Sequence, residues 1–128
     1  MTAPANTITR EQLPSQTEAQ FQAAVMDFAR VHHWRVVHFH DSRREVVNKH
    51  GERKIIGDED ARGWPDLVLL RPPQMKFRPP HMLFVELKRE KGRLRKEQDE
   101  MLQMLWACGG EIKVWRPSDW PAIEEVLM

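Results

Sequence analysis

Three ionisable residues stand next to segments that are otherwise apolar, which makes them the first candidates for chemistry. Asp66 directly precedes the apolar run 67–70, and Glu86 and Lys88 close a second apolar segment, 82–88. Burying a lone carboxylate is unfavourable unless it is paired or binds a cation. Two carboxylates at adjacent strand ends, with a lysine two residues beyond one of them, therefore predict a site where a hard divalent cation meets oxygen ligands.

The alternation of side chains along a strand decides where these groups point. In segment 82–88, Glu86 and Lys88 share a face with Phe84, and the three leucine and valine residues occupy the other face. Both faces are apolar over most of the length, which indicates a central strand. The alternative is a solvent-facing pair of Glu86 and Lys88, with Asp66 as an ordinary turn residue.

The elements that must position these residues follow from periodicity and from the Gly and Pro breaks. We predict a loose arm over 1–14 and one domain over 15–128, which begins with a helix from an N-cap at Ser15 to about 33. The elements expected after this helix are, in order, a strand over 34–40, a hairpin within 41–60, strands over 67–70 and 82–88, a helix over 95–108, a strand over 112–115 and a final helix over 118–127. This alternation predicts a single-domain α/β fold, with a mixed central sheet flanked by helices.

Composition narrows the class of protein. The chain has 128 residues, 41% of them hydrophobic, and a mean hydropathy of −0.63, which fits one globular domain and no membrane protein. The N-terminus carries no secretory pattern, and the single cysteine, Cys108, excludes an intrachain disulfide, so we expect a cytoplasmic protein with Cys108 as a small buried group. The net charge of +1 does not by itself indicate a nucleic-acid binder, but the basic residues concentrate in 88–96.

The joint spacing is more specific than any one motif. Gly63-Trp64-Pro65-Asp66, followed about twenty residues later by Glu86-Leu87-Lys88 and then by Gln98 on a helix, resembles the PD-(D/E)XK nuclease superfamily and, within it, the VRR-NUC family. The resemblance extends from Glu18 to about Val114. It implies a restriction-endonuclease-like core and a DNA phosphodiesterase that depends on Mg²⁺ or Mn²⁺.

The resemblance also implies roles for single residues. Asp66 and Glu86 match the metal-binding acids, the Leu87 carbonyl matches a backbone ligand, and Lys88 matches the lysine that orients the attacking water. Glu18 matches a helical glutamate of the metal site, and Gln98 matches a glutamine beside the acids.

Two of these residues also have a purely structural interpretation. Ser15 and Glu18 have the spacing of a capping box, in which Glu18 would bond back to the Ser15 amide. Gln98 could instead satisfy a helix end or the core.

Basic residues near the predicted site are candidate phosphate contacts. They are Arg43, Arg44, Lys49, Arg53 and Lys54 in the hairpin segment and Arg89, Lys91, Arg93, Arg95 and Lys96 after the second strand. The alternative is an ordinary solvated face.

Histidines and tryptophans give weaker signals. His38 and His40 could form a transition-metal site, but a DNA contact by His40 is favoured. Four tryptophans are expected to pack in the core, namely Trp34, Trp106, Trp115 and Trp120, whereas Trp64 is expected near the site and exposed.

The resemblance further implies a structure-selective endonuclease acting on branched DNA such as four-way junctions, usually as a homodimer and often phage-encoded. A noncatalytic DNA-binding module, a restriction-type or nicking nuclease and a protein-interaction domain are the alternatives. The residues themselves indicate neither dimerisation nor a preference for branches.

Overall fold

The computed structural model describes residues 16–39, 44–56, 60–73 and 78–128, so the predicted arm over 1–14 lies outside the described part. The elements are α1 (Glu18–Val31), β1 (Arg35–His38), β2 (Arg44–Val47), β3 (Arg53–Ile56), β4 (Leu67–Arg71), β5 (His81–Leu87), α2 (Lys96–Ala107), β6 (Ile112–Trp115), the 3-10 turn η2 (Pro117–Asp119) and α3 (Trp120–Leu127). Among the residues described, no helix is long and apolar enough to cross a membrane.

Four strands form the main sheet in the order β1-β4-β5-β6. The pairs β1–β4 and β4–β5 are antiparallel, and β5–β6 is parallel, with α2 as the connection between β5 and β6. The predicted mixed sheet is therefore confirmed, as is the central place of the strand that carries Glu86. The strands β2 and β3 form a separate antiparallel hairpin.

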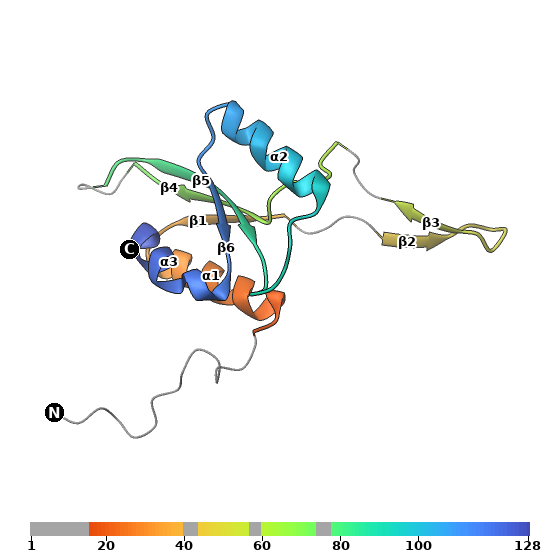
Figure 1. Ribbon diagram of the computed structural model, residues 1–128, viewed down its shortest axis with the longest axis horizontal. Coiled ribbons are helices and arrows are strands. Elements are labelled where there is room, and N and C mark those ends of the chain that lie inside the picture. Colours follow the sequence, from red (N-terminus) through yellow and green to blue (C-terminus); the bar gives the residue numbers. More distant parts are fainter. Residues whose placement is uncertain (1–15, 40–43, 57–59, 74–77) are drawn as a thin grey trace, which may run out of the picture.

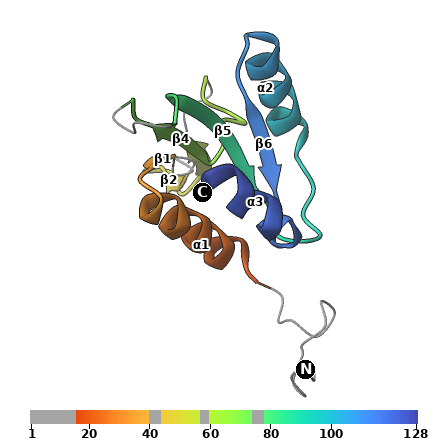
Figure 2. The same ribbon diagram turned by 90° about the vertical axis from the view of Figure 1, so that its left-hand side faces the viewer.

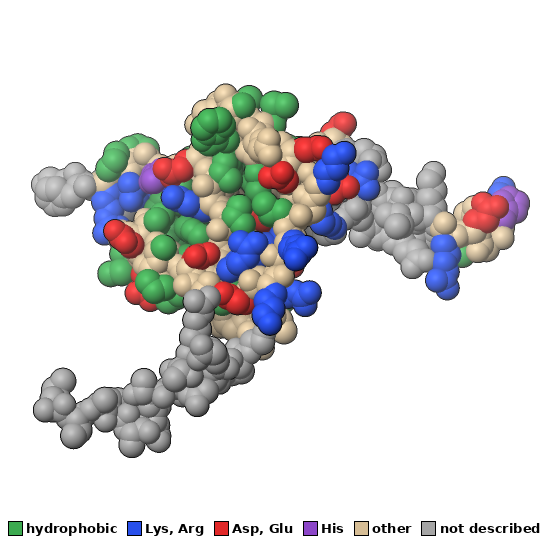
Figure 3. Space-filling view, viewed as in Figure 1, with side chains coloured by type: hydrophobic (Ala, Val, Ile, Leu, Met, Phe, Trp, Pro, Cys, Tyr) green, Lys and Arg blue, Asp and Glu red, His purple; other side chains and the backbone are tan. Residues whose placement is uncertain are grey.

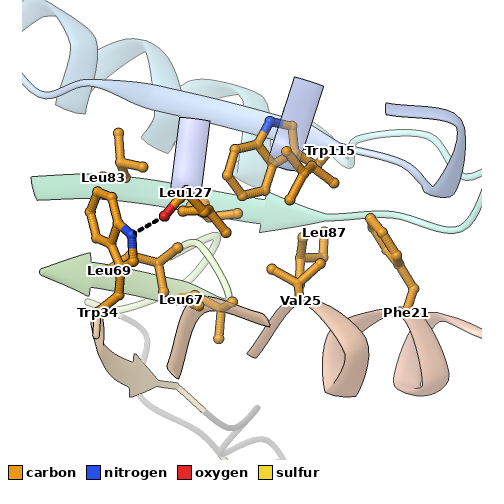
Figure 4. Packing of buried hydrophobic residues seen from close by; sticks show 12 residues of the cluster. Phe21, Val25, Trp34, Leu67, Leu69, Leu83, Leu87, Trp115 and Leu127 are labelled. Carbon is orange, nitrogen blue, oxygen red and sulfur yellow. Dashed lines mark hydrogen bonds between the residues drawn. The ribbon is translucent and has the colours of Figure 1, made fainter. Parts of the chain in front are cut away.

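Helices α1 and α3 cover one face of the sheet, and α2 covers part of the other (Figures 1 and 2). The core lies between the sheet and helices α1 and α3 (Figure 4). There, the buried Trp34 donates its indole N–H to the Leu127 carbonyl oxygen at 2.9 Å and so ties α3 to the start of β1. The other face of β5 carries Phe84 and Glu86, with Lys88 just after the strand, and it lies toward α2.

The first helix begins two residues later than the sequence pattern suggests. Thr17 is its N-cap: its Oγ1 accepts from the Gln20 amide at 3.1 Å, and Gln20 Oε1 accepts from the Thr17 amide at 3.0 Å. The predicted N-cap at Ser15 is therefore wrong, because a second pair with capping-box spacing lies two residues further on and is the one used. Glu18 is the first helical residue rather than the reciprocal partner of a cap.

Two core assignments fail on the last turn of α2. Helix α2 buries Gln98 and Leu102, which lie in its first two turns, whereas Trp106 is 72% exposed and Cys108 is also exposed. The expected burial of Trp106 and Cys108 is wrong because the sheet covers only the start of this helix. The other assignments are confirmed: Trp34 and Trp115 are buried, and Trp120 packs against the core.

Candidate active site

Asp66 and Glu86 lie next to each other at one edge of the sheet. Leu67 pairs with Val85 across β4 and β5, so the residue before β4 lies beside the residue after Val85. One Asp66 carboxylate oxygen, Oδ2, accepts from the Leu87 amide at 2.8 Å. The Asp66 carbonyl oxygen accepts from the amide of Phe39 at 2.9 Å. The residue is therefore held by hydrogen bonds from both sides, by the end of β5 and by the chain just after β1.

Glu86 is almost fully buried, at 1% exposure. Its Oε1 accepts from Gln98 Nε2 at 3.2 Å and lies 3.9 Å from Lys88 Nζ. Its Oε2 is buried and has no hydrogen-bond partner among the residues described. Burial, followed by the negative charge of Asp66, raises the pKa of Glu86 to about 9, while the charge of Lys88 acts in the opposite direction. The site thus holds a carboxyl group whose ionised form lacks compensation.

Lys88 and Gln98 approach Glu86 from two different elements. Lys88 is 8% exposed, and its amide donates to the Trp115 carbonyl oxygen at 3.0 Å, which continues the β5–β6 pairing beyond β5. Gln98 Oε1 accepts from the Arg95 amide at 2.9 Å, while its Nε2 donates to Glu86. Both interpretations of Gln98, a bond at the start of the helix and a contact with the acids, are therefore correct together.

Glu18 reaches this site through its charge. It is exposed in the first turn of α1, and its negative charge is among the influences that raise the pKa of Glu86. One turn further on, Gln22 contacts the Nε2 atom of His38 and so links α1 to the end of β1. His40 lies outside the described residues.

The donor groups fit a hard cation that keeps open positions. Within the described ranges, no three His, Cys, Asp or Glu side chains form a ready-made metal site. The suggested histidine site includes His40 and so lies partly outside these ranges. Mg²⁺ characteristically takes one or two carboxylates and completes its shell with waters and substrate oxygens. Two neighbouring carboxylates and the unpartnered Glu86 Oε2 match that requirement.

The loop before Asp66 is clamped onto α2, a feature that the sequence interpretation missed. Gly63 has a φ of 80°, and a Cβ added there would lie 2.2 Å from the Glu97 carbonyl oxygen. Trp64 packs edge-to-face on Phe39 and Phe84, at ring-centroid distances of 5.7 and 5.9 Å. Trp64 is half-buried rather than exposed, and its Nε1 is buried with no partner in the described part of the chain. A glycine directly before the Trp-Pro-Asp motif was the available signal.

Exposed cations gather beside this edge. Figure 3 shows Lys and Arg side chains over the loop from β5 to α2, where the exposed basic residues are Arg89, Lys91, Arg93, Arg95 and Lys96. Two hydrogen bonds hold the loop to the segment after β6: Arg116 Nη2 donates to the Gly92 carbonyl oxygen at 2.8 Å, and the Ser118 amide donates to Glu90 Oε2 at 2.9 Å.

The other predicted phosphate contacts lie in the hairpin segment. Lys49 and Arg53 are exposed there. Arg43 lies outside the described residues, as do the side chains of Arg44 and Lys54.

Gly63→Ala tests the contact between the loop before Asp66 and α2, with Gly109→Ala as a matched control. Both glycines have a positive φ, 80° and 93°, but a Cβ at Gly109 meets nothing within 4 Å. We expect Gly109→Ala to lower the free energy of unfolding by about 1 kcal/mol from backbone strain alone, and Gly63→Ala to lower it by at least about 2 kcal/mol more through the clash with α2. Urea unfolding measures both, and equal losses would contradict the clamp.

Glu86→Gln tests the buried carboxyl group. In metal-free protein the folded state keeps a proton on Glu86 that the unfolded chain releases, so the free energy of unfolding should fall as pH rises from about 4.5 to about 9. Glutamine cannot ionise and can still accept from Gln98, so the variant should be more stable than wild type near neutral pH by about 1 to 3 kcal/mol. Urea unfolding in chelator at about pH 5 and about pH 8 checks this, and an unchanged pH dependence would contradict it.

Comparison with known proteins identifies the family of this chain. The model of the VRR-NUC domain matches residues 13–119, a span that includes the acid pair, Lys88, Gln98 and Glu18. No match is found among curated proteins or among solved structures. The matched span covers most of the chain, and the four-stranded mixed sheet with its flanking helices is consistent with a restriction-endonuclease-like fold. The chain belongs to the VRR-NUC family of nucleases.

Proposed function

We propose that this protein is a DNA endonuclease that depends on Mg²⁺ or Mn²⁺. The observation that carries the proposal is the carboxyl pair: the buried Glu86 lies beside the half-buried Asp66, and one oxygen of Glu86 is unpartnered in the described structure. Such an arrangement is unfavourable for folding alone, since the ionised form of Glu86 is a buried charge that needs compensation. A bound cation would supply it.

Asp66 and Glu86 would hold the cation, with the Leu87 carbonyl and Glu18 as further ligands. A bound divalent cation lowers the pKa of a water ligand and offsets the charge on a phosphate. Gln98 supports this role because its amide fixes one oxygen of Glu86 and leaves the other available.

Lys88 is proposed to act on the attacking water and on the reacting phosphate. Its ammonium lies 3.9 Å from Glu86 Oε1 at the end of the central strand. A fixed positive charge stabilises the negative charge that accumulates as the water oxygen bonds to phosphorus and one ester oxygen leaves. Because Lys88 is itself 8% exposed, this charge acts with little screening by water.

DNA would approach along the loop between β5 and α2. The exposed cations of that loop follow Lys88 directly in the chain, and the bonds from Arg116 and Ser118 keep the loop in place. Phosphate contacts of this kind position a duplex without reading its sequence.

The proposal extends to branched DNA and to a homodimer. One chain carries one acid pair, whereas resolving a four-way junction requires a cut in each of two strands. A dimer with twofold symmetry would place two equivalent sites on one junction.

Cleavage of labelled linear duplex, single-stranded and four-way-junction DNA tests this function. We expect cutting with Mg²⁺ or Mn²⁺, none with chelator, and a loss of about a hundredfold or more in Asp66→Asn and Glu86→Gln. Glu125→Gln, which removes an exposed carboxylate of α3, is the control and should cut like wild type. Binding without cutting under any metal would instead establish a noncatalytic DNA-binding module.

Glu18→Gln separates a role in the metal site from a role in the helix. Because the capping box is made by Thr17 and Gln20, the substitution should change the free energy of unfolding by no more than about 0.5 kcal/mol and lower the cleavage rate about tenfold. Thr17→Ala removes the cap itself and should cost about 1 kcal/mol with a smaller effect on rate. The reverse pattern would assign Glu18 to the helix alone.

A further inference from the structure

The β2–β3 hairpin is an arm that makes few contacts with the rest of the described chain. Its strands pair only with each other, and neither packs extensively against the main sheet or the described helices. Figure 1 shows it projecting away from the body of the protein. An isolated two-stranded hairpin is marginally stable in water. In this hairpin the apolar side chain of Val47 is 61% exposed, so no other element covers it in the described structure.

The turn at the end of the arm is organised by its own residues. Asn48 Oδ1 accepts from the amides of His50 and Glu52 at 2.9 and 3.0 Å, and the Asn48 amide donates to the Glu52 carbonyl oxygen at 2.9 Å. Gly51 supplies the positive φ of 77° that the turn requires. The tip therefore holds a defined shape without help from another element.

The charge at this tip favours a polyanionic partner. Lys49, His50 and Arg53 are exposed, and the nearby carboxylate of Glu52 accepts a hydrogen bond from Asn48 Nδ2 at 3.0 Å (Figure 3). The described tip thus presents two exposed cations, Lys49 in the turn and Arg53 after it. A protein partner that covered Val47 would have to bury these cations as well, whereas phosphates would pair with them.

The arm leaves the body at the edge that carries the acid pair. It lies in sequence between β1, which ends at His38, and β4, which begins directly after Asp66. The amide of Phe39 donates to the Asp66 carbonyl oxygen at 2.9 Å, so the chain entering the arm is hydrogen-bonded to the site itself. The chain that leads into the arm therefore starts beside the acids.

The width of the arm can be compared with the widths of the two grooves of B-DNA. A pair of strands about 5 Å apart, with side chains on both sides, is compatible with a groove about 12 Å wide and too broad for one about 6 Å wide. These are the widths of the major and minor grooves of B-DNA.

We propose that the β2–β3 hairpin inserts into the major groove of duplex DNA next to the bond that is cut, with Lys49 and Arg53 on phosphates. The inference rests on the proposed nuclease function and adds a duplex-reading element to it. It makes the arm the part of the chain that distinguishes duplex from single-stranded DNA.

The test compares Lys49→Ala/Arg53→Ala with a control pair, Arg30→Ala/Arg35→Ala. The control removes the same amount of positive charge from two exposed arginines, one in the last turn of α1 and one at the start of β1. The start of β1 is the end of that strand away from the acid pair. Binding of the full chain to duplex and single-stranded oligonucleotides is measured in chelator over a salt series, and molar mass is measured by light scattering. The tip variant should bind duplex about tenfold more weakly than the control, with a salt slope smaller by about 1.8, and should lose less on single strands.

Three results would overturn the inference. The first is duplex binding by the tip variant equal to that of the control, and the second is an equal loss on single strands, which would indicate a general phosphate contact. The third is a lower molar mass for the tip variant alone, which would show that the arm holds a second copy of the chain. If one of these results is obtained but the wild-type protein still cuts DNA, only the inference about the arm fails and the proposed function is retained. Wild-type protein that neither binds nor cuts DNA would overturn both.

Discussion

The carboxyl group of Glu86, buried beside Asp66 at the end of a central strand, is the constraint to which the surrounding structure responds. A buried carboxylate next to a second one is unfavourable in proportion to the water it has lost. The Gln98 amide and the Lys88 ammonium both approach the same oxygen, Oε1, and partly compensate its charge. The other oxygen, Oε2, has no partner within the described residues. A core built only for stability would hold an apolar side chain here, so the compensation that is still missing points to a ligand.

Topology explains how groups so distant in sequence reach this one place. The antiparallel pairing of β4 and β5 puts the residue before β4 beside the end of β5, and the parallel β5–β6 pair requires a connection that carries Gln98 back over the sheet. Gly63 permits the loop before Asp66 to touch the α2 backbone directly. The loop and the helix therefore hold Asp66 and Gln98 in a common frame, and a disturbance of one should displace the other.

Several independent features meet at the same edge of the sheet. The first turn of α1 brings the charge of Glu18 there, the loop after β5 brings exposed cations, and the β2–β3 arm begins there. The opposite end of the sheet is different in character, since Trp34 and Leu127 close the core by a hydrogen bond between β1 and α3. A polyanion that approaches the acids therefore does not meet this contact, which closes the core at the other end of the sheet.

Local patterns along the chain were sufficient to predict most of the helices and strands. The apolar runs bounded by Asp66 and by Lys88 predicted strands that are confirmed as β4 and β5, and alternation along 82–88 predicted which side chains share a face. The face with Leu83, Val85 and Leu87 is the one in the core. Tertiary structure decided what depends on contacts between distant segments. Two capping-box spacings lie at the start of α1, and only the folded chain shows that Thr17 is the cap. Helical periodicity gave no sign that the sheet ends before Trp106, nor that Gly63 touches Glu97. The physical reason is that periodicity sets the direction of a side chain on its own element, whereas burial and charge compensation depend on what another element places opposite it.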